Sequence, residues 1–322
     1  MKNFFKKALR ISIKILIGLI ALVVLFFATV FTVNYFALKS EAKKIEDYGQ
    51  KVTIDGGHKM NVVTLGKGKD KPTIVLLPGY GTPSPGNDYD ELGRLLDKNY
   101  QIVIVEPFGY GMSDVTETPR TTANMNKELH QVLQKLDIKD YTLMGHSIAG
   151  IYAIEYISRY GDEVNAFIGI DSSYPTQPME DIPVESLQTL NKMGFNRLIA
   201  SIMPDALMLP PRASQEVKDQ VKYIGYRNMM NEDVGDEAKR FTQNFKSASK
   251  VSLPKDLPVF FIISSESDEA DPTTWTAGHE GLIKGNPNGK IEILKGPHYL
   301  HHTQVKTIAN DVTEFLDSHN IK

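Results

Sequence analysis

Runs of consecutive apolar residues along this chain alternate with segments in which apolar residues recur every three or four positions. The runs lie at 73–77, 102–105, 141–144, 166–170, 259–263 and 291–294. Continuous apolar runs of this length are typical of strands buried on both faces of a parallel sheet. The helical spacing covers 89–96, 122–136, 148–160 and 305–316. This alternation predicts a doubly wound, mostly parallel α/β sheet, preceded by a two-stranded hairpin at 51–55 and 60–65.

Residues 175–250 interrupt the alternation. They contain several helical patterns and no convincing strand, with Pro210 and Pro211 between the helical segments. We therefore expect a helical cap at 175–250, inserted into a core made of residues 51–174 and 251–322.

The first 38 residues differ in composition from the rest. Residues 15–38 carry no charge, and they follow five basic residues without an acid: Lys2, Lys6, Lys7, Arg10 and Lys14. About 20 helical residues cross a bilayer core. A cleaved signal peptide is the alternative, but its apolar region usually has about 7–15 residues and ends in a small-x-small site. Here the boundary reads Asn34-Tyr35-Phe36, which favours an uncleaved transmembrane anchor.

The leading basic flank predicts the orientation of that anchor. Positive residues stay on the cytoplasmic side. We therefore expect a single-pass protein of the cell membrane in which residues 1–38 form a cytoplasmic basic tail and the transmembrane anchor. A charged juxtamembrane stalk at 39–50 then leads to an extracytoplasmic domain. Lys39, Lys43 and Lys44 on the far flank act against this orientation.

Charge and cysteine content exclude several classes of function. The 322-residue chain has a net charge of −3, so removing the five N-terminal positive charges leaves −8 on the rest. An acidic domain is a poor nucleic-acid binder, and no nucleic-acid partner is expected. The absence of cysteine excludes disulfides, cysteine nucleophiles and thiolate metal sites.

Gly145-His146-Ser147-Ile148-Ala149 lies between a predicted strand and a predicted helix. This spelling is close to Gly-x-Ser-x-Gly, in which a tight strand-to-helix turn holds a nucleophilic serine above the sheet. Neighbours two residues either side must be small, and alanine meets that need. The helix that follows offers the backbone N–H of Ile148 to a developing oxyanion.

A second oxyanion donor is expected after the strand at 73–77. Leu77-Pro78-Gly79-Tyr80-Gly81 follows that strand, and its glycines allow the backbone to approach a ligand. The N–H of Tyr80 is the candidate donor.

The candidate base and acid lie near the end of the chain. His298 follows the last predicted strand, with His301 and His302 close by as alternatives. Asp268 follows the strand at 259–263, which gives the order nucleophile, acid, base. The alternatives for the acid are Glu266, Asp271 and, after another strand, Asp171. A metal site made of the three histidines is not expected, since no carboxylate lies at ligand spacing in the sequence.

Three blocks together resemble the α/β-hydrolase fold superfamily, in its serine-nucleophile, cap-bearing branch: LLPGYG at 76–81, EPFGYGMSD at 106–114 and GHSIAG at 145–150. Pro78 stands where many relatives have histidine, and Glu106 stands where the family has aspartate in a loop-shaping turn. The resemblance implies hydrolysis of an ester-like bond through an acyl-enzyme on Ser147. Dehalogenases and epoxide hydrolases of this fold carry aspartate there.

The expected mechanism is acyl transfer by Ser147, His298 and Asp268, with the oxyanion at Tyr80 and Ile148 and without metal or organic cofactor. The open alternatives are an amidase, a thioesterase, an acyltransferase, carbon–carbon bond chemistry, or a non-catalytic ligand-binding protein of the cell surface. Five methionines of the cap predict an apolar acyl or alcohol group as the preferred substrate part: Met193, Met203, Met208, Met229 and Met230.

Overall fold

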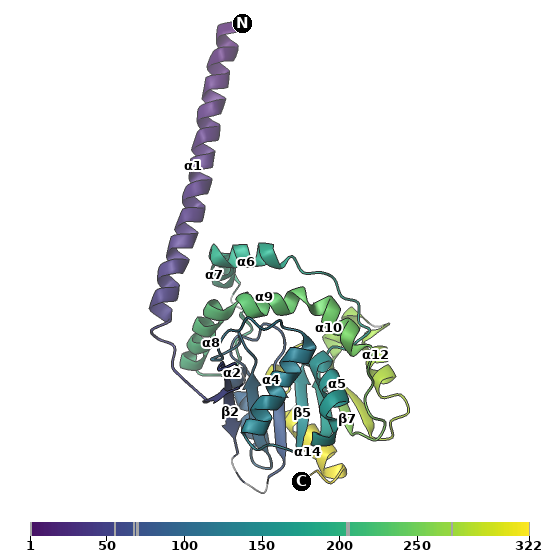
Figure 1. Ribbon diagram of the computed structural model, residues 1–322. Coiled ribbons are helices and arrows are strands. Elements are labelled where there is room, and N and C mark those ends of the chain that lie inside the picture. The colour runs from purple at the N-terminus through teal and green to yellow at the C-terminus, as the bar shows by residue number, and fades with distance from the viewer. Residues whose placement is uncertain are drawn as a thin grey trace.

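A computed structural model describes residues 2–54, 56–66, 68, 71–203, 207–271 and 273–321 (Figure 1). Eight strands form one sheet in the order β1-β2-β4-β3-β5-β6-β7-β8. Their bounds are β1 Gln50–Thr53, β2 Lys59–Leu65, β3 Thr73–Leu77, β4 Gln101–Glu106, β5 Tyr141–His146, β6 Val164–Ile170, β7 Val259–Ser264 and β8 Gly289–Leu294. The pairs β1–β2 and β2–β4 are antiparallel, and the remaining pairs are parallel.

The sheet confirms the predicted fold class. Strands β3, β5 and β7 are buried at every position, because helices cover both faces of the parallel part. This is why their sequences are apolar without alternation. The expected hairpin is the antiparallel pair β1–β2 at the edge of the sheet.

Helices precede, connect and follow the strands. They are α1 Lys2–Glu41, α2 Pro85–Asp88, α3 Asp90–Leu96, α4 Thr122–Lys135, α5 Ala149–Tyr160, the 3-10 turn η1 Gly161–Glu163, α6 Val184–Lys192, α7 Phe195–Ile202, α8 Gln215–Asn228, α9 Glu232–Lys239, α10 Phe241–Ala248, α11 Ser265–Ala270, α12 Trp275–Leu282, α13 Leu300–Thr303 and α14 Val305–Ser318. Residues of α4 and α5 join one buried cluster with the sheet, and residues of α3 and α14 join the other. The sheet therefore separates two apolar layers.

Helices α6–α10 all lie between β6 and β7 in the chain and gather at one end of the sheet (Figure 1). Buried polar contacts fasten α9 and α10 to the core. The Glu237 carboxylate of α9 accepts hydrogen bonds from the Tyr110 and Tyr152 hydroxyls, and Asn244 of α10 accepts one from the Thr122 amide. Helices α6 and α7 form the outer layer of this helical group.

Helix α1 projects away from the rest of the molecule (Figure 1). Its residues Phe4–Glu41 are long and apolar enough to cross a membrane. Tyr35 is exposed near its C-terminal end, at the place where amphipathic aromatic side chains are enriched in membrane-spanning helices.

Two glycines allow a matched test of how closely α5 packs: Gly150 near its start and Gly161 directly after its end. A Cβ on Gly150 would overlap the Ser173 carbonyl oxygen and lie 2.9 Å from the Ser172 Cβ, whereas a Cβ on Gly161 would lie 3.8 Å from the nearest atom, in Ile157. Gly150→Ala should lower the free energy of unfolding by about 1–3 kcal/mol through overpacking. Gly161→Ala is the control, and urea unfolding measures both. Equal stabilities would contradict the close approach of α5 to the loop after β6.

Candidate active site

Ser147 occupies the turn between β5 and α5 with a strained backbone. Its φ is +56°, a left-handed conformation that residues other than glycine, asparagine and aspartate rarely adopt. The surrounding structure holds this conformation in place: the Ser147 amide donates to the Ile170 carbonyl at 3.2 Å, and the Ser147 carbonyl accepts from the Ser173 amide at 2.8 Å. Strain of this kind clusters at active sites.

Small residues are needed on both sides of this turn. A Cβ on Gly145 would lie 2.9 Å from the Cβ of Ala149. The two positions therefore face each other, and alanine at 149 is accommodated because its partner is glycine. This contact explains how the turn forms without the second glycine of the usual spelling.

The Gly79–Tyr80 segment adjoins Ser147 from the neighbouring strand β3. A Cβ on Gly79 would lie 3.2 Å from the Ser147 Cβ. The Tyr80 hydroxyl donates to the Val234 carbonyl of α9 at 3.1 Å, and its ring packs edge-on against Phe241 at 4.8 Å. The Tyr80 side chain thus points to the helical group, while its backbone stays beside Ser147. Within the part of the chain that the structure describes, no hydrogen bond engages the amides of Tyr80 and Ile148.

His298 pairs with Asp171. The His298 Nδ1 lies 2.5 Å from the Asp171 Oδ2, and the Asp171 side chain is 0% exposed while that of His298 is 40% exposed. The same carboxylate accepts from the Ser267 hydroxyl, the Ser264 amide and the Trp275 indole N–H. With Nδ1 donating to the carboxylate, the Nε2 of His298 is left as the basic nitrogen.

The expectation that Asp268 would lie behind His298 is wrong. Asp268 lies on the short helix α11 rather than in a loop, and its carboxylate accepts from the Thr276 hydroxyl at 2.5 Å. Asp171 is the residue beside His298, because it follows β6 directly and its amide donates to the Ile262 carbonyl of β7. The sequence signal for Asp171 was its place directly after a buried strand. Asp268 also comes after a buried strand, but it lies within the helix that follows. Neither Glu266 nor Asp271 contacts His298; the Asp271 carboxylate accepts from Thr274.

His146 fixes the main chain of the candidate base. Its Nε2 lies 3.0 Å from the His298 carbonyl oxygen, and the two rings are 4.5 Å apart. Burial lowers the pKa of His146 well below its usual value, so the ring is neutral at pH 7 and donates from Nε2. His146 therefore ties the residue before Ser147 to the backbone of His298. Among the described residues, no hydrogen bond joins Ser147 to the His298 ring; such contacts often tighten only when substrate binds.

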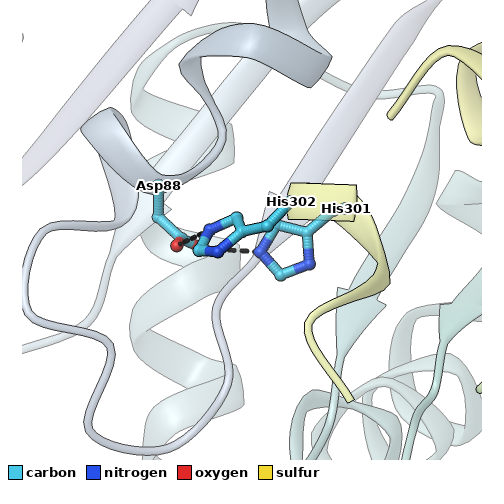
Figure 2. Close-up of side chains that lie close together, drawn as sticks. All are labelled: Asp88, His301 and His302. Carbon is cyan, nitrogen blue, oxygen red and sulfur yellow. Dashed lines mark hydrogen bonds and ion pairs between the residues drawn. The ribbon is translucent and has the colours of Figure 1, made fainter. Parts of the chain in front are cut away.

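His301 and His302 point toward Asp88 (Figure 2). Their Nε2 atoms donate to the two Asp88 oxygens at 2.9 and 2.7 Å. A carboxylate from α2, more than 200 positions away in sequence, thus completes a group that sequence spacing did not reveal, and all three could reach one ion. The N···O separations are hydrogen-bond distances, shorter than the about 3.3 Å between ligands around tetrahedral zinc. We therefore interpret the cluster of Asp88, His301 and His302 as a structural contact that holds the loop containing His298.

Charge balance agrees with that assignment. Burial opposes ionisation of Asp88, but the His301 and His302 N–H groups outweigh it and hold the pKa of Asp88 below its usual value. Burial also lowers the pKa of His301. A carboxylate held by two ring N–H donors fastens α2 to the segment that directly follows His298.

Glu106, at the end of β4, shapes the loop beside β3. Its buried carboxylate accepts from the Met112 amide, the Gly86 amide and the Asn61 side chain. Burial raises the pKa of Glu106. These contacts agree with the loop-shaping role expected for Glu106.

Four of the methionines predicted to form the pocket roof differ in their surroundings. Met208, Met229 and Met230 line a cavity of about 220 Å³ that also borders Tyr80 and Gly81. Met203 is exposed at the end of α7. The cavity therefore joins part of the predicted methionine roof to the loop beside Ser147.

Comparisons with known proteins agree with this architecture. The sequence profile of the α/β hydrolase fold matches residues 72–197. An uncharacterised Bacillus subtilis protein, YbdG, is 28% identical over 315 residues, 94% of this chain and 96% of its own length. A 2-hydroxy-6-oxononadienedioate/2-hydroxy-6-oxononatrienedioate hydrolase from Paraburkholderia phymatum is 28% identical over 173 residues, 48% of this chain and 60% of its own length.

A solved structure shows the same fold. The esterase EaEST from Exiguobacterium antarcticum matches with a TM-score of 0.63 and 19% identity, covering 84% of this chain and 100% of its own. This chain therefore has the α/β-hydrolase fold, and the profile of that fold matches part of the sequence.

Two aspartates allow a matched test of the pairing at His298. Asp171→Asn should lower kcat/KM for a p-nitrophenyl ester roughly 10³-fold or more, because only a carboxylate there sets the tautomer and stabilises the charged ring. Asp268→Asn should change it only a few-fold. Thermal unfolding of both variants checks that the loss is not a loss of fold. A dead Asp268→Asn with an active Asp171→Asn would contradict the geometry.

Buried histidines predict how stability depends on pH. Burial lowers the pKa of His146, His279 and His301, so below about pH 6.5 the unfolded chain binds protons that the folded chain does not. The free energy of unfolding should therefore fall as pH falls from 7 to 6. Each histidine contributes up to about 1.4 kcal/mol per pH unit.

His279→Gln isolates one of these contributions. Buried carboxyls act in the opposite direction, such as Asp233 with its pKa raised to about 6 by burial, but they are the same in both proteins. Urea unfolding of the detergent-solubilised chains at pH 7 and pH 6 should give a smaller loss for the variant. An unchanged loss would show that His279 takes up its proton without unfolding.

Proposed function

We propose that this chain is a membrane-anchored serine hydrolase that cleaves a carboxylic ester through an acyl-enzyme. The observation that carries the proposal is the strained Ser147 at the head of α5 together with the His298–Asp171 pair. Residues 1–38 form the cytoplasmic tail and membrane anchor, and residues 39–50 form the stalk. Residues 51–174 with 251–322 form the catalytic core, and residues 175–250 form the cap. The catalytic domain lies outside the cytoplasm.

In this proposal Ser147 Oγ attacks the ester carbonyl while His298 Nε2 takes its proton. Asp171 holds the ring and stabilises its positive form. The amides of Tyr80 and Ile148 donate to the oxyanion. The tetrahedral intermediate collapses with release of the alcohol, which receives the proton from His298, and leaves an ester on Ser147. Water attacks that ester in the second half of the cycle, again with His298 as base.

Asp171 replaces Asp268 in this assignment, and the remaining residues are those proposed from sequence. The apolar cavity beside Tyr80 favours an apolar group on the substrate. The EaEST name supports ester chemistry, whereas hydrolysis of a 2-hydroxy-6-oxo dioate, the substrate class in the name of the Paraburkholderia relative, is the second candidate. Both use the same nucleophile and base.

A fluorophosphonate probe tests the proposal directly. The wild-type chain should be labelled covalently on Ser147, located by peptide mass spectrometry, and should hydrolyse short p-nitrophenyl esters. Ser147→Ala should fold normally, remain unlabelled and lose roughly 10³-fold or more of the activity. A folded wild-type protein that neither labels nor hydrolyses would make the domain a binding protein.

A further inference from the structure

Helix α7 is fastened to α1 along the apolar part of α1. The Phe195 ring lies 5.5 Å from the ring of Phe27 and 6.5 Å from that of Phe26. A Cβ on Gly194 would lie 2.6 Å from the Asn34 Cβ and 3.1 Å from the Val30 carbonyl oxygen. The start of α7 therefore rests directly on α1, and α7 cannot move away from it without breaking this contact.

An ion pair between α7 and α1 strengthens the same contact and neutralises the charge of α7. Arg197 is the one charged residue of α7. Its guanidinium makes two hydrogen bonds to Glu41, at 2.7 and 2.6 Å, and one to Asn34 at 3.0 Å, and it stacks 3.9 Å above the Tyr226 ring. With its charge satisfied inside the contact, α7 presents no free charge to its surroundings.

These contacts set the depth of α7 in a bilayer. Phe27 precedes Asn34 by seven residues, which is about 10 Å along a helix. If α1 spans the membrane, with Tyr35 at its interface, then Phe195 lies at the level of the acyl chains. Figure 1 shows α6 and α7 on the side of the domain from which α1 projects.

The surface around α7 has the composition that such a depth requires. Phe195, Ile199 and Ile202 recur at the spacing of one helix face. Ile199 is 46% exposed, Ile202 73% and Met203 62%. Together with other exposed residues of the helical group they form what we name the apolar collar: Leu187, Leu190, Ile199, Ile202, Met203 and Met208. Exposed apolar side chains gathered on one group of helices favour contact with an apolar partner.

The collar adjoins a cavity that reaches the loop after β3 at Tyr80 and Gly81. Met208 belongs to the collar and also lines the 220 Å³ cavity that borders Tyr80, the proposed oxyanion donor. We propose that the apolar collar sits in the outer leaflet and that the substrate is the acyl ester of a bilayer lipid, which enters beside Met208. This inference rests on the proposed anchoring and esterase activity, and it names where their substrate comes from.

The absence of cysteine makes the membrane contact measurable. Two single variants, Ile202→Cys and the control Ile293→Cys, are labelled with bimane in the full-length chain and reconstituted into phosphatidylcholine vesicles. Ile293 is an exposed isoleucine of β8, with 48% exposure. Lipids brominated on their acyl chains should quench bimane at position 202 and not at position 293. Equal, weak quenching at both positions would overturn the membrane contact.

A second arm tests the substrate class. Ile202→Asp in vesicles should hydrolyse a membrane-embedded fluorogenic diacylglycerol at least about tenfold more slowly than wild type, because a charge there opposes burial in lipid. It should keep wild-type turnover of soluble p-nitrophenyl butyrate, and Ile293→Asp should keep both. Equal turnover of the embedded ester by both variants would overturn lipid entry at the collar. A wild-type chain that cleaves neither ester overturns the proposed activity and the substrate class, whereas the quenching still decides the membrane contact.

Discussion

The Asp171 carboxylate is the point on which the candidate site depends. It is fully buried and receives hydrogen bonds from four partners: the Ser264 amide, the Ser267 hydroxyl, the Trp275 indole and His298. A buried carboxylate is tolerated only when it is paired and hydrogen-bonded. These partners come from the end of β7, from α11, from α12 and from the loop after β8, so one side chain sets the mutual position of four segments.

Three further histidines hold the loop that carries His298. His146 binds the His298 main chain, and His301 and His302 bind Asp88 just beyond it. Burial lowers the pKa of His146 and of His301, so these two rings fix the loop without placing positive charge beside His298, the proposed base. The site is therefore rigid around His298, while the outermost helices α6 and α7 take their position from α1.

Much of the fold was predictable because parallel strands buried on both faces leave continuous apolar runs. The turn at Ser147 was predictable because only small residues fit around it. The partner of His298 was not, since Asp171 and Asp268 both come after buried strands, and the sequence does not show that Asp268 lies within helix α11. The Asp88 contact and the contact of Arg197 with Glu41 join residues more than 150 positions apart, and no local pattern in the sequence reports such pairs.

The structure of the covalent fluorophosphonate adduct tests the central claim most directly. The account predicts phosphorus bonded to Ser147 Oγ, with one phosphoryl oxygen about 2.7–3.1 Å from the amides of Tyr80 and Ile148. The His298 Nε2 should face the adduct, with Nδ1 still on Asp171. An adduct on another residue, or a phosphoryl oxygen that points away from both amides, would contradict it.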